Sequence, residues 1–121
     1  MITRRLALST LAAFPLAALS ATDARAQSGG TALRVGGFYN AFGMNADGSK
    51  YTGQVQISQV GNAVELFWVV GGQQYSGRGV LNGAVMTVDW GASTPVIYVV
   101  VGNELHGTWD GGTALERLVP R

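Results

Sequence analysis

The residues that most often carry out catalysis are sparse in this chain. It has one histidine, His106, and no cysteine. Alternation along residues 104–109 places His106 on an outer face beside Glu104 and Thr108, with no positioned nucleophile that it could serve as a base. A lone histidine without cysteine cannot form a zinc site from nitrogen and sulfur ligands. We therefore expect no catalytic residue, no metal site and no cofactor, in a protein that is not an enzyme.

Two other groups of polar residues are explained better by structure than by chemistry. Asn45, Asp47 and Ser49 resemble an oxygen-rich calcium loop, but the downstream glutamate of an EF-hand is missing. Side chains that hydrogen-bond their own backbone in a turn account for this segment. Asp89 and Asp110 each adjoin a tryptophan and could form a glycosidase pair. Alternation turns Asp89 outward, so we expect a solvated carboxylate there.

Aromatic residues offer the stronger binding chemistry. Seven rings are many for so small a core: Phe38, Phe42, Tyr51, Trp68, Tyr75, Trp90 and Trp109. They either fill the interior or line an apolar cup with a few polar groups that orient a ligand. The candidate ligand site under the second interpretation consists of three rings and three polar residues, namely Trp68, Trp90, Trp109, Asn40, Asn45 and Ser49.

The first 26 residues have the pattern of a cleavable export signal. Arg4 and Arg5 precede an apolar stretch over residues 6–19, and Ala-Arg-Ala at residues 24–26 is a small-x-small cleavage pattern. The stretch is shorter than the roughly 20 residues that a membrane-spanning helix needs. Residues 27–33 form a polar, flexible leader. We expect a periplasmic or secreted protein, exported by the general secretory or the twin-arginine route.

Charge and size bound what the exported chain can do. At 121 residues the chain holds one domain, and without the signal it keeps five basic and six acidic residues, a net charge of −1. Capture of nucleic acid or anionic lipid by electrostatic attraction is therefore not expected. No cysteine is present for a disulfide or lipid attachment, and no stretch after the signal is a candidate membrane span.

Short apolar runs separated by turn residues predict eight strands over residues 34–121. Two-residue turns are expected at 61–62, 71–72, 82–83, 102–103 and 111–112, and longer loops at 45–49 and 92–94. The expected strands are 34–40, 50–60, 63–70, 73–81, 84–91, 95–101, 104–109 and 113–119.

This pattern predicts an all-β fold, an eight-stranded antiparallel up-and-down barrel. Tight turns throughout leave no room for a helical crossover, so the strands form a meander. Glycine recurs at the inward positions Gly53, Gly77 and Gly107. Glycine at these positions lets the strand bend in a strongly coiled sheet, and it makes room for a large neighbouring side chain. Closure into a barrel removes exposed edges, and a two-sheet sandwich is the alternative.

One stretch resembles the opening strand of avidin-type biotin binders. Residues 36–43, Gly-Gly-Phe-Tyr-Asn-Ala-Phe-Gly, are similar to that strand, and residues 87–90 resemble a middle strand of the same proteins. The resemblance implies an avidin- or lipocalin-like meander barrel, with Asn40 as a polar ligand contact and Trp90 as a wall of the pocket. Met44 stands where the family has a serine, so the resemblance implies the barrel rather than biotin as the ligand.

A second resemblance covers nearly the whole exported chain. The residues that carry it are Tyr39, Gly43, Asn45, Asp47, Gly48, Ser49, Tyr51, Gly53, Gly107, Thr108, Trp109, Glu116 and Leu118. In this pattern the sequence looks like a group of small exported bacterial proteins, mostly uncharacterised, some of which carry a fibronectin-binding label. The resemblance implies an adhesin-like role without assigning residues to it.

Two functions follow as expectations. The first is a binding module that takes a small apolar or amphipathic ligand at the open end of the barrel. The second is surface interaction with an extracellular or envelope protein by a fully packed barrel. Residues 95–101 are apolar on both faces, and outward Phe67, Val69, Ile97, Val99 and Val101 are also apolar. Such a strand is commonly covered by another subunit, so self-association is a further expectation.

Overall fold

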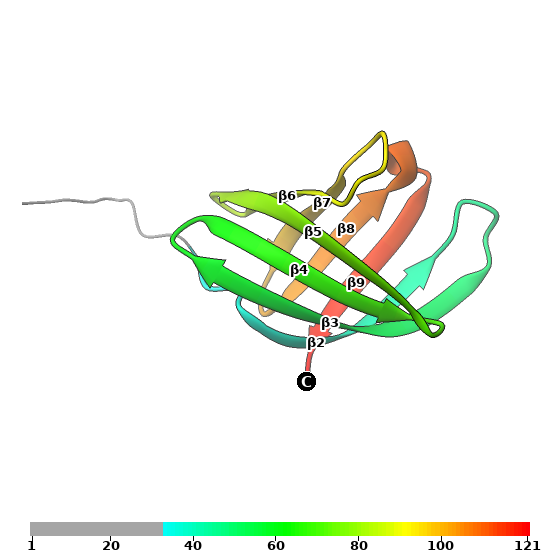
Figure 1. Cartoon of the computed structure of the whole chain (residues 1–121), viewed down its shortest axis with the longest axis horizontal. Helices are drawn as coiled ribbons and strands as arrows, with labels where there is room; N and C mark the ends of the chain where they lie inside the picture. Colours follow the sequence, from blue (N-terminus) through cyan, green and yellow to red (C-terminus); the bar gives the residue numbers. More distant parts are fainter. Residues whose placement is uncertain (1–32) are drawn as a thin grey trace, which may run out of the picture. The chain divides into compact units, whose positions relative to one another are not determined.

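Residues 33–121 form a barrel of eight antiparallel strands, β2 to β9, in the computed structural model, which describes these residues (Figure 1). Each strand pairs with its neighbours in sequence, and β9 pairs with β2 to close the barrel. The predicted all-β meander barrel is confirmed. No helix within residues 33–121 is long and apolar enough to cross a membrane. The predicted signal at 1–26 and leader residues 27–32 lie outside the described residues.

The strand bounds agree closely with the turn pattern, except at the first strand. This strand was expected at 34–40, but it begins three residues later and extends to Met44, which pairs with Lys50. The extension is closed by the 45–49 turn, where the Asn45 amide donates to the Ser49 carbonyl at 2.8 Å. The strands are β2 Gly37–Met44, β3 Lys50–Val60, β4 Ala63–Val70, β5 Gln73–Asn82, β6 Val85–Asp89, β7 Val96–Val101, β8 Glu104–Trp109 and β9 Ala114–Pro120.

Two turns differ from the expected positions. The β5–β6 turn consists of Gly83 and Ala84 rather than residues 82–83, because Asn82 still pairs with Val85. The expected turn at 111–112 is part of a short 3-10 segment, η2 (Asp110–Gly112). Asp110 itself has a positive φ of 53°. These two shifts leave the meander unchanged.

Inward and outward positions alternate along the strands as expected. On β3, Val55 and Ile57 are buried, and the glutamines between and before them are exposed. Phe38 and Phe42 do not fill the core, because Tyr39 and Ala41 take the inward positions of β2. The Phe42 ring lies outside, 5.4 Å from the Arg117 guanidinium carbon. The core residues are Val35, Tyr39, Ala41, Val55, Ile57, Val64, Leu66, Trp68, Leu81, Met86, Val88, Val96, Tyr98, Leu105 and Leu118.

One end of the barrel is covered by the segment that precedes β2. Val35 is buried there, and its backbone is held by two side chains. Its amide donates to Gln59 Oε1 at 2.7 Å, and its carbonyl accepts from the Tyr39 hydroxyl at 2.6 Å. The opposite end, which carries the connections 45–49, 71–72, 90–95 and 110–113, is called the open end below.

Inward glycines allow close packing inside the wall. A Cβ atom at Gly107 would stand 2.5 Å from Cδ1 of Tyr98, so the tyrosine ring lies over the glycine. At Gly79 a Cβ atom would overlap the Thr87 carbonyl oxygen of the neighbouring strand. These two contacts support the explanation that glycine permits tight coiling and makes room for large neighbours.

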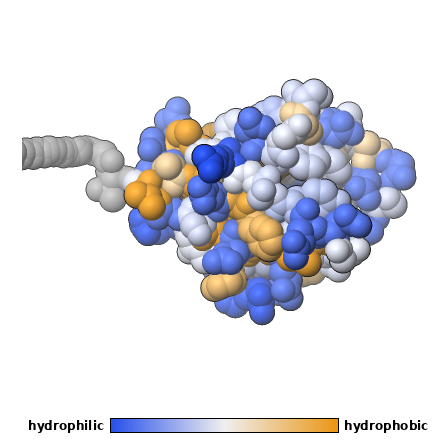
Figure 2. Space-filling model, viewed as in Figure 1, coloured by the Kyte–Doolittle hydropathy of each residue, from blue (hydrophilic) through white to orange (hydrophobic). Residues whose placement is uncertain are grey.

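The outer wall carries exposed apolar side chains. Phe67, Val69, Ile97, Val99 and Val101 are exposed by 39% to 50%, as expected. Figure 2 shows apolar and polar side chains interspersed on the face turned toward the viewer. Strand β7 is thus apolar on both faces, with Val96 and Tyr98 buried inside the barrel.

Candidate functional site

A cavity of about 350 Å³ lies at the open end of the barrel. Its wall is predominantly aromatic, and its polar groups are few. The lining residues are Asn45, Tyr51, Trp68, Val70, Tyr75, Trp90, Val96, Trp109 and Glu116. Seven of them lie in strands, and Asn45 and Trp90 directly follow β2 and β6, so barrel closure itself gathers them. All three tryptophans of the sequence line this one cavity.

Four of the rings form a chain of edge-to-face contacts. Tyr75 contacts Trp90 with ring centroids 6.0 Å apart, and Trp90 contacts Trp109 at 5.8 Å. Trp109 contacts Tyr51 at 6.3 Å. Edge-to-face pairs of this kind add about 0.5–1.5 kcal/mol beyond their buried area. The rings therefore hold one another in place before any ligand arrives.

Glu116 is the buried acid of this site, with 6% of its surface exposed. Its Oε1 accepts a hydrogen bond from the Tyr51 hydroxyl at 2.7 Å. Its Oε2 accepts from the Tyr98 hydroxyl at 2.5 Å and from Trp68 Nε1 at 3.1 Å. Trp109 Nε1 donates to the Tyr51 hydroxyl at 3.1 Å and thereby fixes the first of these donors. The donors come from β3, β4 and β7, and the single acceptor comes from β9.

The strand register explains how the tyrosines reach the acid. Gly43 pairs with Tyr51 on one side and with Glu116 on the other, and Gly107 pairs with Glu116 and with Tyr98. The five residues therefore form one row across five strands, with Glu116 in the middle. Each tyrosine ring lies over a glycine, where a side chain would overlap it. The glycines thus permit both hydroxyls to meet the same carboxylate.

Burial and the charge of Glu116 keep the two phenols protonated. Removal from water is the largest cause that raises the pKa of Tyr51 and of Tyr98, followed by the negative charge of Glu116 and the hydrogen bond to it. Two indole N–H groups donate to the phenols, Trp109 to Tyr51 at 3.1 Å and Trp68 to Tyr98 at 3.2 Å. These bonds lower the two pKa values but are outweighed. Both hydroxyls are consequently donors at neutral pH.

The structure brings four of the six predicted site residues to the cavity. Trp68, Trp90, Trp109 and Asn45 line it. Asn40 does not, since it lies between the inward residues Tyr39 and Ala41 and faces the outer side of β2. Side chains alternate between the two faces of a pleated strand, and this alternation turns the Asn40 side chain outward whatever its type.

Ser49 also lies away from the cavity lining, in the turn between β2 and β3. Its hydroxyl donates to Asp47 Oδ1 at 2.6 Å and accepts from Asn45 Nδ2 at 3.0 Å. The Ser49 amide donates to the same Asp47 oxygen at 2.9 Å. These hydrogen bonds lower the pKa of Asp47. These are the hydrogen bonds expected of a turn in this segment. Ser49 therefore stabilises the loop that places Asn45 at the cavity.

Glu116 was not among the predicted site residues, although the sequence contains a signal for it. In the run Ala114-Leu115-Glu116-Arg117-Leu118, alternation puts the glutamate on the same face as Ala114 and Leu118, both fully buried. An acid at an inward position of a strand is rare unless it is paired. Tyr51 and Tyr98 could not be assigned to it from sequence, because their approach depends on barrel closure.

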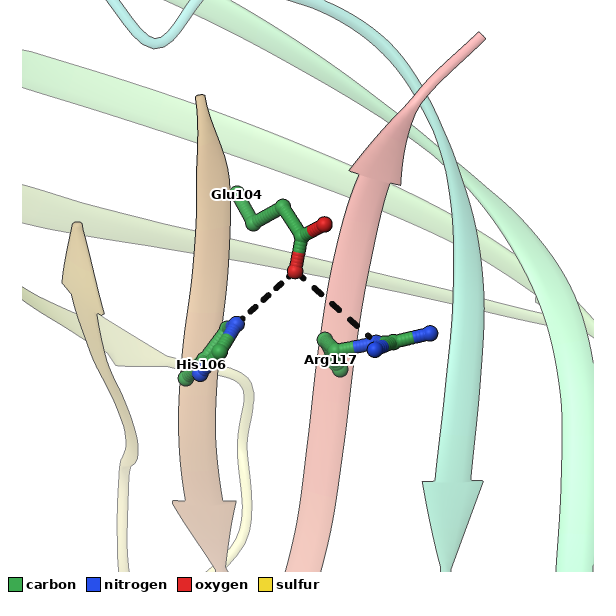
Figure 3. Close-up of polar contacts among 3 residues, drawn as sticks. All are labelled: Glu104, His106 and Arg117. Carbon is green, nitrogen blue, oxygen red and sulfur yellow. Dashed lines mark hydrogen bonds and ion pairs between the residues drawn. The ribbon is translucent and has the colours of Figure 1, made fainter. Parts of the chain in front are cut away.

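His106 lies outside the barrel and away from the cavity. Its Nε2 is 2.9 Å from Glu104 Oε1, and Arg117 Nε lies 4.0 Å from the same oxygen, so Glu104 stands between the two (Figure 3). The expected outward direction of His106 is confirmed. Exposed polar contacts of this kind contribute at most about 1 kcal/mol to stability.

Comparisons with protein-family models, with curated proteins and with solved structures found no match. The resemblances to avidin-type barrels and to small exported bacterial proteins therefore stay predictions.

Proposed function

We propose that this protein is an exported, non-enzymatic binding module that takes a small, largely apolar ligand at the open end of its barrel. The observation that carries the proposal is the aromatic cavity of about 350 Å³. Small-molecule sites are mostly apolar hollows of about 300–1,000 Å³ with a few polar groups. The cavity lies at the lower end of that range, which suits one small molecule.

The filled and empty parts of the barrel support a carrier rather than a solid scaffold. Buried apolar side chains, among them Val35, Ile57 and Leu66, fill the interior away from the open end, whereas the open end keeps its cavity. The edge-to-face ring contacts hold the walls in place, so a ligand has little ordering cost to overcome on binding. Burial of its apolar surface against the rings then supplies the driving force.

The polar groups of the cavity suit the orientation of a ligand. Glu116 is fixed by hydrogen bonds from Tyr51, Tyr98 and Trp68, and the two phenols are held protonated. A few fixed polar groups in an apolar site set the orientation of a bound molecule. The proposed export to the periplasm or cell exterior rests on the sequence pattern of residues 1–26 alone.

The proposal is tested by ligand capture. Purified protein is incubated with a mixed metabolite and lipid extract, and bound species are identified by native mass spectrometry. Because every tryptophan lines the cavity, a bound ligand is expected to change the intrinsic fluorescence in a saturable way. An outer-wall variant, Phe67→Ala, serves as the matched control and should capture the same species. Failure to retain any small molecule from such extracts would contradict the proposal.

Surface interaction is the second candidate, favoured by the exposed apolar residues of the outer wall. Ile97, Val99 and Val101 on β7 are each exposed by 40% or more, and Val99 pairs with the exposed Val85 of β6. Contiguous exposed apolar surface commonly marks contact with another protein. An adhesin-like role, or association of this chain with itself, would use this face. A mass of one chain at high concentration in size-exclusion chromatography with light scattering would contradict self-association.

A further inference from the structure

We infer that the ligand of the open-end cavity carries an organic cationic group, such as a substituted ammonium, that lies against the aromatic rings and toward Glu116. This inference rests on the proposed function, since it specifies the chemistry of the molecule that the same cavity would hold. It follows from three observations: an acid without a basic partner, acceptor capacity left on that acid, and the rings in front of it.

Glu116 has no basic partner in the part of the chain that the structure describes. Within residues 33–121 the ion pairs use Glu65 or Glu104 as the acid, and none involves Glu116. Arg117 follows directly in sequence, but it lies on the other face of β9 against Phe42 and Glu104. A buried carboxylate is costly unless it is paired with a cation or fully hydrogen-bonded.

The hydrogen bonds to Glu116 leave room for one more donor. A carboxylate has about four acceptor positions. Oε2 uses two of them, for Tyr98 and Trp68, whereas Oε1 accepts from Tyr51 alone. Glu116 is also part of the cavity lining. The remaining capacity is therefore on an oxygen of an acid that borders the space where a ligand would lie.

The walls of the cavity are suited to a cation. Tyr51, Trp109, Trp90 and Tyr75 form a continuous series of rings from the acid outward. Faces of tryptophan and tyrosine attract ammonium groups, and the attraction is stronger where water is excluded. A negative charge at the inner end of this series adds to that attraction. An anionic ligand would be repelled by the same carboxylate.

The test compares two probes of the same shape and different charge. Phenyltrimethylammonium is cationic, and tert-butylbenzene is its neutral counterpart. Binding of each to the purified protein is measured by tryptophan fluorescence and by calorimetry. We expect the cation to bind about tenfold tighter than the neutral probe. Glu116→Gln keeps the shape of the side chain and removes its charge, so it should abolish the preference and bring the affinities of the two probes to within about twofold of each other.

The outcomes distinguish failure of the cation inference from failure of the proposed binding function. If the neutral probe binds as tightly as the cation or tighter, the cation inference is wrong and the proposed function stands. If neither phenyltrimethylammonium at millimolar concentration nor tert-butylbenzene at its solubility limit binds, both are wrong. If folded Glu116→Gln retains the full preference for the cation, Glu116 is not its cause and the inference is overturned.

A structural measurement covers the case in which Glu116→Gln does not fold. Nuclear Overhauser contacts are recorded between bound phenyltrimethylammonium and the unmodified protein. We expect the N-methyl protons to contact the rings of Tyr51 and Trp109, which lie next to the acid. Contacts of these rings with the phenyl group of the probe alone would place the cation away from Glu116 and overturn the inference.

Discussion

Gly43 on β2 and Tyr51 on β3 are paired positions, and the Tyr51 ring occupies the space that a side chain at position 43 would fill. Gly43→Ala is therefore expected to displace the ring and break its hydrogen bond to Glu116. Forcing extra volume into a packed interior costs about 1–3 kcal/mol. The free energy of unfolding from urea titrations, with intrinsic fluorescence as the signal, measures this loss.

Gly36→Ala is the matched control for that substitution. A Cβ atom at Gly36 would meet its nearest neighbour, the Ile57 carbonyl oxygen, at 3.6 Å, which is an ordinary contact. We expect its stability to stay within about 0.5 kcal/mol of the unmodified protein. Equal effects of the two substitutions would show that the space over Gly43 is not what holds Tyr51 in place.

Removal of the Glu116 acceptor is expected to be costly. In Glu116→Leu, the hydroxyls of Tyr51 and Tyr98 lose their shared acceptor. The indole N–H of Trp68 also loses Glu116 but keeps the Tyr98 hydroxyl oxygen at 3.2 Å. Each buried polar group left without a partner costs about 1–3 kcal/mol. We expect a total loss of about 2 kcal/mol or more, measured as a shift of the urea midpoint.

Glu104→Gln provides the comparison at an exposed acid. Glu104 contacts His106 and Arg117 on the outer wall, so its loss should change stability by no more than about 1 kcal/mol. A Glu116→Leu protein as stable as Glu104→Gln would contradict the role assigned to the buried acid.

Alkaline pH is expected to destabilise the barrel through its buried tyrosines. The pKa values of Tyr39, Tyr51 and Tyr98 are raised in the folded state, chiefly by burial. Above about pH 10 the unfolded chain releases these protons and the folded chain keeps them. The unfolded state then binds fewer protons, so the free energy of unfolding falls as pH rises. The slope is about 1.4 kcal/mol per pH unit for each tyrosine that is still protonated in the folded state and ionised in the unfolded state.

Tyr51→Phe isolates one of these contributions. The variant has one titrating phenol fewer, so its stability should fall less steeply between about pH 10 and 12, by about 1.4 kcal/mol per pH unit. Urea unfolding at a series of pH values measures both slopes. Identical slopes for the two proteins would show that Tyr51 ionises alike in the folded and unfolded states.

The proposed cation contact makes Trp90 a second determinant of ligand choice. Trp90 lies between Tyr75 and Trp109 in the chain of rings. Trp90→Leu keeps an apolar wall but removes a ring face, so we expect phenyltrimethylammonium to bind about fivefold more weakly. Binding of tert-butylbenzene should change far less. Phe67→Leu on the outer wall is the control. Calorimetry measures the affinity of each probe for the unmodified protein and for both variants.

Most of the fold follows from local pattern. The alternation of Val55 and Ile57 with polar residues, and glycine at nearly every turn, predicts the strands and their order. The first strand is the exception, because Phe38 and Phe42 are apolar and outward and the true bounds depend on pairing with β3 and β9. Pairing between the two ends of the chain leaves no local signature.

The candidate site is predictable only in part for the same reason. The three tryptophans are obvious as a group, and the alternation around Glu116 marks it as an inward acid. Nothing in the sequence brings Tyr51, Tyr98 and Trp68 to that acid, since they come from three separate strands and meet only at a certain register of the closed sheet. Asn40 was assigned to the site from a motif resemblance but lies on the outer side of β2. A motif resemblance does not determine which side of the strand a residue faces.

The position of the acceptor on β9 ties assembly of the pocket to completion of the sheet. β9 is the last of the eight barrel strands in sequence, and it supplies both the second partner of β2 and the carboxylate that accepts from two phenols and an indole. Until β9 docks, the wall is unsealed and the two phenols lack their acceptor. The cavity is therefore completed in one step, when β9 joins β2 and β8.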